Sequence, residues 1–265
     1  MIPGAVMPVG MTPVGGAAAM GKAPPPIVLD DVTLKHGSVV AVDGLSGVFA
    51  PGSLTALIGP NGAGKSTLLR AIAGLHKLSG GRIDRGSLTA ADIALLPQGG
   101  SLDRSFPISC RDVVALGFSG RVGAFRAMSA DRLRAAERAL AAVGLPDHAA
   151  RPIGALSAGQ FQRVLFARMI VQDAPVLLLD EPFSAVDAST TEDLLGILRL
   201  WHSQGRTIIT VLHDLDLVHD AFPRTLLLDG GLVAWGPTAA ALTEANRHRA
   251  GLPRQGWALA HQHAD

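Results

Sequence analysis

A short glycine-rich stretch constrains the fold of this chain more than any other feature. Residues 59–67 read Gly-Pro-Asn-Gly-Ala-Gly-Lys-Ser-Thr, with an apolar run at 54–58 before them and a helix-compatible segment at 65–73. Glycines here let the backbone curl so that successive N–H groups point at one anion, and the N-terminus of the following helix adds positive potential. This context predicts a phosphate-binding loop, rather than a plain glycine turn with an exposed lysine.

The residues of this loop are candidate contacts to a nucleotide. Lys65 is predicted to bridge the β- and γ-phosphates, and the Ser66 hydroxyl is predicted to bind Mg²⁺. By itself such a loop indicates only that ATP or GTP is bound. The candidate contacts are Gly59, Pro60, Asn61, Gly62, Ala63, Gly64, Lys65, Ser66 and Thr67.

Two acidic residues follow a second apolar run, at 176–179. Asp180 is expected at the carboxyl end of a buried strand, where it can hold Mg²⁺. Glu181 is expected to orient and polarise the attacking water. An ordinary acidic turn is the simpler alternative, but the phosphate loop upstream favours the catalytic interpretation.

Composition excludes several classes of protein. With 48% hydrophobic and 17% charged residues among 265, the chain is not globally disordered, and its net charge of +1 gives no reason to expect a nucleic-acid partner. No apolar run reaches the roughly 18 to 20 residues that cross a bilayer, so we expect no membrane span. Cys110 is the single cysteine of the sequence, which excludes an intrachain disulfide; we expect it to be a small buried or half-buried apolar residue.

Alternating strand and helix patterns predict an α/β fold. A helical segment at 190–203 separates two strands, which implies parallel pairing with a right-handed crossover. Residues 36–38 are predicted as a turn, and Gly230 and Gly231 as the turn of a final hairpin. Between about 90 and 156 helical periodicity prevails, with Ser129 as an N-cap. The predicted strands are 27–32, 39–42, 54–58, 176–179, 207–212, 225–228 and 232–235.

One further motif carries a family resemblance. Residues 156–160 read Leu-Ser-Ala-Gly-Gln, and here the chain resembles the ATP-binding-cassette (ABC) ATPases, whose signature reads Leu-Ser-Gly-Gly-Gln. The motifs of the family occur in the same order in this chain, over residues 27–243 approximately. The resemblance implies a P-loop NTPase core with a mixed sheet and an inserted helical subdomain at about 98–165, with ATP and Mg²⁺ as cofactors. The domain would span 27–245, after a disordered extension at 1–26 and before a polar tail at 246–265.

The resemblance assigns roles to residues outside the phosphate loop. Gln98 would touch Mg²⁺ or the attacking water, the alternative being a loop amide. His213 would sense the γ-phosphate, the alternative being a helix-capping or strand-end histidine. In this family the signature of one copy faces the nucleotide of a second, head-to-tail copy. Ser157, Gly159, Gln160 and Asp187 would make these contacts across the dimer. Asp187 can also be a helix N-cap.

The chain departs from the family pattern in two places. His36 stands where an aromatic ring usually stacks on adenine, so we expect weaker stacking, since base stacking contributes roughly 1–3 kcal/mol and imidazole is a small ring. Ala158 replaces the usual first glycine of the signature, with mild expected effects.

The segment around Phe106 indicates a type of transporter. Its Phe-Pro step before an Asp-Val-Val run, at 112–114, is similar to the ATPase subunits of zinc and manganese importers. An exposed Phe106 would suit docking by an integral membrane permease. The resemblance thus implies a peripheral protein at the cytoplasmic face of the cell membrane, with a substrate-binding protein as an indirect partner. Importers of iron chelates, haem or cobalamin remain alternatives, as does a soluble ABC ATPase; a small-molecule phosphotransferase would not explain the signature.

Histidines near the end of the chain suggest a weaker hypothesis. His248, His261 and His263 could in principle ligate zinc, but histidines on a polar tail are more often solvated. We therefore expect no metal site there.

Overall fold

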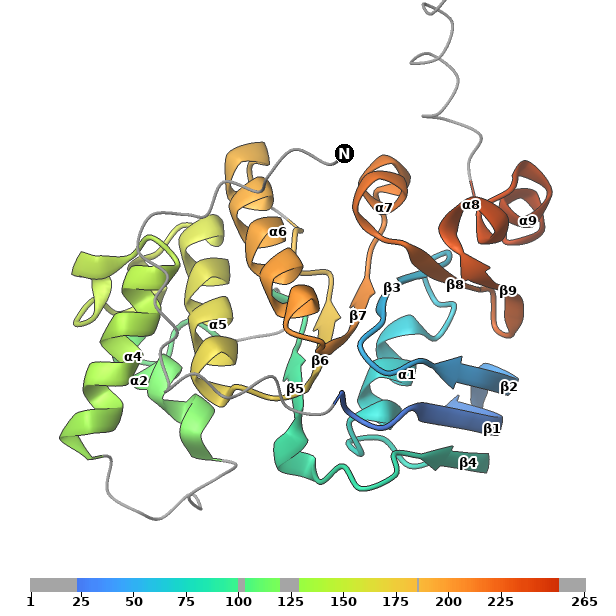
Figure 1. Cartoon of the computed structure of the whole chain (residues 1–265), viewed down its shortest axis with the longest axis horizontal. Helices are drawn as coiled ribbons and strands as arrows, with labels where there is room; N and C mark the ends of the chain where they lie inside the picture. The colour runs from blue at the N-terminus through green and yellow to red at the C-terminus, as the bar shows by residue number, and fades with distance from the viewer. Residues whose placement is uncertain (1–22, 100–102, 120–128, 185, 253–265) are drawn as a thin grey trace, which may run out of the picture. The chain divides into compact units, whose positions relative to one another are not determined.

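The structure is a computed structural model that describes residues 23–99, 103–119, 129–184 and 186–252 (Figure 1). These residues form two compact units. The helical unit comprises the described residues between 103 and 173 together with 186–194, and the sheet unit comprises the remaining described residues.

The sheet unit is built on a six-stranded mixed sheet in the order β5-β6-β7-β3-β8-β9. Its first five strands pair in parallel, and β9 pairs antiparallel with β8, as the predicted hairpin requires. Every residue of β3, β6 and β7 is buried, which is why these strands read as continuous apolar runs. The strands are β3 (Leu54–Ile58), β5 (Ile93–Leu96), β6 (Val176–Asp180), β7 (Thr207–Val211), β8 (Arg224–Leu228) and β9 (Leu232–Pro237).

A second, antiparallel sheet belongs to the same unit, in the order β2-β1-β4. β1 (Ile27–His36) and β2 (Val39–Phe49) are longer than predicted, and the predicted turn at 36–38 is wrong for His36, which ends β1. β4 (Gly80–Asp84) was not predicted, because only Ile83 of its residues is buried. The strands exceed the predicted lengths because the sheet buries only part of each one, so polar residues interrupt the apolar pattern.

The core of the sheet unit joins both sheets through α1 (Lys65–Ile72), the helix after the phosphate loop. Leu68, Leu69 and Ile72 of this helix belong to one buried cluster with side chains from β1, β2, β3, β6, β7 and β8. This packing holds α1 in place, and the phosphate loop leads directly into the N-terminus of this helix.

Three short helices belong to the later part of the sheet unit: α7 (Leu215–Ala221) connects β7 to β8, and α8 (Thr238–Ala241) and α9 (Glu244–Arg249) follow β9. The expected polar tail begins later than 246, because Asn246 in α9 donates hydrogen bonds to the carbonyl oxygens of Ala240 and Ala241, at 3.3 and 3.1 Å. His248 lies exposed in α9, whereas His261 and His263 lie outside the described residues.

The helical unit packs α2 (Cys110–Ala115), α4 (Ala130–Ala142) and α5 (Ala158–Gln172) against one another. Ser129 caps α4 as predicted, and Cys110 is buried. The unit reaches Asp173, beyond the expected limit of 165, and takes in the first turns of α6 (Ala188–Ser203). Among the described helices, none combines the length and apolar character that a membrane crossing needs.

Candidate active site

The phosphate loop connects β3 to α1 and depends on its glycines. Gly62 and Gly64 both have φ of 85°, in the left-handed region that favours glycine. A Cβ atom on Gly64 would lie 2.3 Å from the carbonyl oxygen of Ala41, and one on Gly59 would lie 2.1 Å from that of Leu228. The loop is therefore packed too closely against β2 and β8 for side chains at these two positions.

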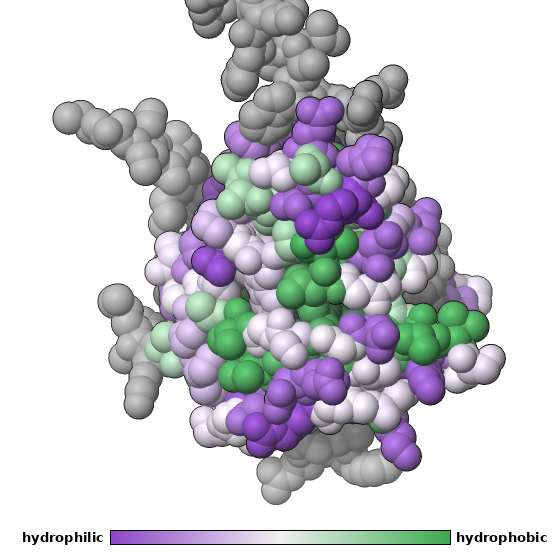
Figure 2. Space-filling model, turned by 90° about the vertical axis from the view of Figure 1, so that its right-hand side faces the viewer, coloured by the Kyte–Doolittle hydropathy of each residue, from purple (hydrophilic) through white to green (hydrophobic). Residues whose placement is uncertain are grey.

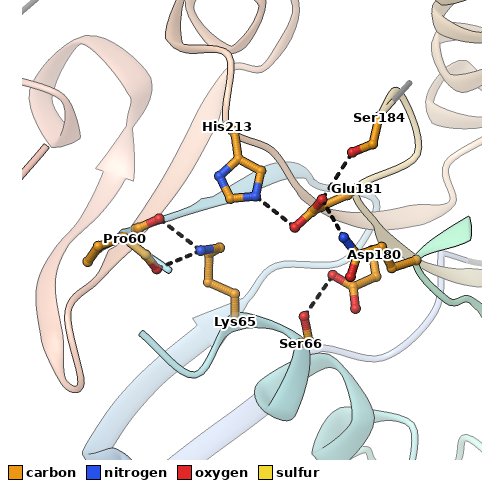
Figure 3. A network of polar contacts seen from close by, with 9 residues as sticks. Pro60, Lys65, Ser66, Asp180, Glu181, Ser184 and His213 are labelled. Carbon is orange, nitrogen blue, oxygen red and sulfur yellow. Dashed lines mark hydrogen bonds and ion pairs between the residues drawn. The ribbon is translucent and has the colours of Figure 1, made fainter. Parts of the chain in front are cut away.

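Lys65 is held inside the loop. Its Nζ donates hydrogen bonds of 2.8 Å to the carbonyl oxygens of Gly59 and of Pro60, and only 6% of the residue is exposed (Figure 3). Burial lowers the pKa of Lys65, and the nearby carboxylates of Glu181 and Asp180 partly offset this. A cation already positioned at the loop is suited to bind phosphate oxygens.

Asp180 ends β6 and lies beside the first turn of α1. The Ser66 hydroxyl donates a 3.0 Å hydrogen bond to its Oδ1 atom. Burial raises the pKa of Asp180, against the hydrogen bond from Ser66. A hydroxyl and a carboxylate oxygen side by side are the ligand types that Mg²⁺ binds, so these residues fit that ion.

Glu181 is the centre of a polar network at the same edge of the sheet (Figure 3). His213 Nε2 donates to its Oε1 at 2.7 Å, and Oε2 accepts from Gln98 Nε2 at 2.8 Å and from the Ser184 hydroxyl at 3.0 Å. Burial acts to raise the pKa of Glu181, but the hydrogen bonds from His213 and Ser184 and the electrostatic interactions with His213 and Lys65 lower it overall. The carboxylate is therefore ionised near neutral pH, as a group that polarises water must be.

The backbone of Glu181 is also unusual. Its φ is 50°, in the left-handed region that a residue with a side chain rarely adopts. Such strain is retained where surrounding contacts hold it and is concentrated at functional sites. Ser184, whose amide donates a 3.2 Å hydrogen bond to the Glu181 carbonyl, closes this turn.

The topology explains why these residues meet. The strands β5, β6, β7 and β3 are adjacent in the sheet, in this order. Asp180 ends β6 and Glu181 follows it. Gln98 follows β5, His213 follows β7 and the phosphate loop follows β3. The carboxyl ends of neighbouring parallel strands lie at one edge of a sheet, where α/β proteins bind ligands. The contact of Ser184 with Glu181 was not predicted, since its only local signal is a spacing of three residues.

In the helical unit, the signature residues lie together at the N-terminus of α5. Ser157 caps this helix in a reciprocal pair with Gln160: the Gln160 amide donates to the Ser157 hydroxyl at 3.2 Å, and the Ser157 amide donates to Gln160 Oε1 at 3.1 Å. Gly159 follows within the first turn. The N–H groups of a helix start have no partner within the helix, so this terminus can accept an anion.

Asp187 immediately precedes α6 and behaves as its N-cap. Its Oδ1 accepts a 2.8 Å hydrogen bond from the Thr190 amide, and its Oδ2 accepts one of 3.2 Å from the Thr190 hydroxyl. The N-cap alternative therefore describes this residue within one copy. A contact across a dimer remains a prediction.

His36 occupies the end of β1, opposite Val39 of β2. Val39 is 67% exposed, and Val40 is exposed beside it. Figure 2 faces the side of the molecule where β2 and β9 lie in Figure 1, and apolar patches are visible there. Only the imidazole was predicted here, and the structure adds the exposed Val39 and Val40 of β2.

Comparison with known proteins decides the family. Residues 32–184 match the family described as ABC transporter. The chain belongs to this family. It is 39% identical to the manganese transport system ATP-binding protein MntB of Bacillus subtilis, over 83% of this chain and 90% of the relative. It is 38% identical to the zinc transport system ATP-binding protein TroB of Treponema pallidum, over 84% and 86%.

Solved structures agree with this placement. A transporter assigned to the metal-chelate ABC type, in an inward-facing conformation, has a TM-score of 0.76 at 28% identity, over 87% of this chain and 89% of that chain. The ATP-binding cassette MJ0796, a dimer bound to ADP and phosphate, has a TM-score of 0.69 at 28% identity, over 80% and 98%. The predicted fold class, family and ATPase activity are confirmed: the chain is an ABC ATPase.

Proposed function

We propose that this chain binds and hydrolyses ATP to power an ABC importer of manganese or zinc ions. The observation that carries this proposal is the convergence of Lys65, Ser66, Asp180 and Glu181 at the carboxyl edge of one sheet. The choice of metal is supported by the relatives named for manganese and zinc transport.

In the proposed reaction each residue has a separate task. The loop amides and Lys65 bind the β- and γ-phosphates, while Ser66, Asp180 and the Gln98 amide oxygen would hold Mg²⁺. That ion would neutralise charge on the phosphate oxygens. Glu181 orients the attacking water and polarises it, and His213 fixes the carboxylate by its 2.7 Å hydrogen bond. Because in-line attack needs little covalent chemistry, positioning and charge supply most of the rate.

A second copy of the chain completes the site in this proposal. The N-terminus of α5, with Ser157, Gly159 and Gln160, would face the γ-phosphate bound by the other copy, and Asp187 would approach its phosphate loop. A helix terminus stabilises an anion by about 0.3–2 kcal/mol, so closure and ATP binding favour one another.

The helical unit offers a surface for the permease. Phe106 is 64% exposed and Leu116 is also exposed. Large apolar side chains at a surface are typical anchors of protein interfaces. We place the chain at the cytoplasmic face of the membrane through this contact, with the substrate-binding protein acting indirectly and no role for nucleic acid.

Iron chelates, haem and cobalamin form the second class of candidate substrate, because the metal-chelate type transporter is structurally similar.

One experiment distinguishes the two classes of substrate. The chain is co-purified with its permease and reconstituted with the binding protein loaded with Mn²⁺, Zn²⁺, a ferric chelate, haem or cobalamin. We expect Mg-dependent ATP hydrolysis that Mn²⁺ or Zn²⁺ stimulates. Stimulation by a chelate, haem or cobalamin alone would contradict the metal assignment, and absence of hydrolysis would contradict the ATPase mechanism.

Replacing Lys65 with alanine should weaken ATP binding about 10- to 100-fold, because a buried cation that bonds to phosphate contributes about 1.5–3 kcal/mol. Isothermal calorimetry on the isolated chain measures this directly. Lys77→Ala is a matched control, since Lys77 is exposed after α1 and outside the loop. Equal affinities of Lys65→Ala and the wild type would refute the phosphate-loop assignment.

Replacing His36 with tyrosine should strengthen ATP binding about 3- to 10-fold, because a larger ring recovers part of the roughly 1–3 kcal/mol of base stacking. His36→Ala should weaken binding. Binding of inorganic triphosphate, which has no base, serves as the control and should be the same for all three proteins. If His36→Ala binds ATP as tightly as the wild type, the base does not stack at this position.

A further inference from the structure

Within the helical unit, the segment that carries Phe106 is joined to the segment that leads into the signature. Residues 108–111 and 149–153 are connected by backbone hydrogen bonds of 2.9 to 3.1 Å, and Ser109 forms an antiparallel bridge with Pro152. Residues 154–156 connect this second segment to Ser157. Because the pairing is antiparallel, the chain that leads back to Phe106 and the chain that leads on to Ser157 leave it at the same end, where Ile153 bonds to Ile108.

Arg104 contacts the first residue of the signature. Its guanidinium group donates hydrogen bonds to the carbonyl oxygens of Leu156 and Ile153, and it lies 4.9 Å from the centre of the buried Phe161 ring. A planar guanidinium can donate in its plane while its face stacks on an aromatic ring, which an ammonium group cannot do. Arg104 therefore holds the residue before Ser157 and the first turns of α5 at once.

The backbone of Arg104 is packed equally closely. A Cβ atom on Gly154 would lie only 2.9 Å from the Arg104 carbonyl oxygen, so something would have to move if a side chain were present. Close-packed interiors transmit displacement because they contain no space to absorb it. A shift of the Phe106 segment must therefore be passed to the residues before Ser157.

From these contacts we infer that Arg104 is a positioning residue that couples permease docking at Phe106 to the placement of Ser157 at the nucleotide. This inference rests on the proposed function, which supplies both the permease and the second copy. Arg104 touches neither ATP nor the permease in this scheme. It keeps the docking segment and the N-terminus of α5 in one arrangement, so that movement of one moves the other.

The test compares Arg104→Ala, Arg104→Lys and the wild type, each reconstituted with permease and binding protein. For Arg104→Ala we expect the stimulated kcat to fall about tenfold, a typical size for coupling between sites, while KM and the ATP affinity of the isolated chain stay within about twofold. Arg104→Lys should recover part of kcat, since its ammonium can still donate to the Leu156 carbonyl. Arg134→Ala is the matched control, because Arg134 is an exposed arginine of the same unit, paired with Asp131 on α4.

A second variant tests the same contact from the other segment. Gly154→Ala should reproduce the loss of stimulated kcat with Arg104 intact. Thermal unfolding of every variant shows whether the helical unit is folded. Two results would overturn the inference: a folded Arg104→Ala protein stimulated like the wild type, or a loss of kcat matched by equal losses of ATP affinity and of thermal stability that Arg104→Lys does not restore.

The wild-type protein separates this inference from the function beneath it. If the wild type does not hydrolyse ATP in the presence of Mg²⁺, the proposed function fails and the inference fails with it. If the wild type is stimulated and Arg104→Ala is stimulated equally, the proposed function stands and the role of Arg104 alone is wrong.

Discussion

Replacement of Glu181 by glutamine should leave ATP bound and slow its hydrolysis by about 10²- to 10⁴-fold, the range that a positioned general base contributes. The amide keeps the shape of the side chain but has no negative charge to polarise water. With its oxygen in the Oε2 position the amide can still accept from Gln98 and Ser184, but its NH₂ group then faces the donor Nε2 of His213. The loss is therefore one of charge and of network geometry together.

The same variant should accumulate as an ATP-bound dimer, because closure precedes hydrolysis in the proposed cycle. Size-exclusion chromatography with light scattering, with and without Mg-ATP, measures this state, and phosphate release measures turnover. Glu244→Gln is a suitable control, since Glu244 is an exposed acid in the first turn of α9. Turnover near the wild-type rate would show that Glu181 is not the group that activates water. Loss of ATP binding would show that it acts on the nucleotide instead.

The phosphate loop was predictable from sequence because its requirements are local. Gly64 must adopt a φ of 85° and must have no Cβ beside the Ala41 carbonyl, and Lys65 bonds to carbonyls only five and six residues away. The glycines and the lysine at this spacing therefore predict the loop conformation from the sequence alone. The acidic pair at the end of β6 was predictable for a similar reason, since a buried strand that ends in two acids has few structural explanations.

The network around Glu181 was predictable only as a list of residues. His213 lies 32 positions and Gln98 lies 83 positions away along the chain, so their bonds to one carboxylate depend on strand order in the sheet. Residue patterns show that strands exist but not which strands are adjacent. The family resemblance supplied that information for Gln98 and His213, but it gave Ser184 no role.

The small sheet and α9 show a different limit. The exposed positions of β1 and β2 interrupt the apolar pattern, and β4 has a single buried residue, Ile83. Such strands are stabilised by backbone pairing and by packing of a few side chains on the core. Residue type alone predicts these interactions poorly. α9 is polar along its length and is held by side chain to backbone bonds from Asn246, so composition indicated a tail.

The sharpest test of the composite site varies which copy of the dimer carries a change at Lys65 and which carries a change at Ser157. Lys65→Ala and Ser157→Arg can be placed in the same copy of a mixed dimer, or in opposite copies, with two affinity tags used to isolate each combination. Arginine at 157 would put a bulky side chain at the start of α5, where the capping serine now bonds the Gln160 amide. Each change should disable any site that uses the altered residue.

The two arrangements lead to opposite results. If a site combines Lys65 of one copy with Ser157 of the other, changes in the same copy disable both sites, whereas changes in opposite copies disable one site and leave the other intact. If each site uses both residues of one copy, the result is reversed. Each protein also carries Glu181→Gln, and the amount of ATP that stays bound after gel filtration is measured. This amount gives the number of intact sites per dimer, even if turnover requires both sites. We expect about one ATP per dimer from the opposite-copy arrangement and close to none from the same-copy arrangement, because each intact helix terminus and lysine together stabilise one bound triphosphate.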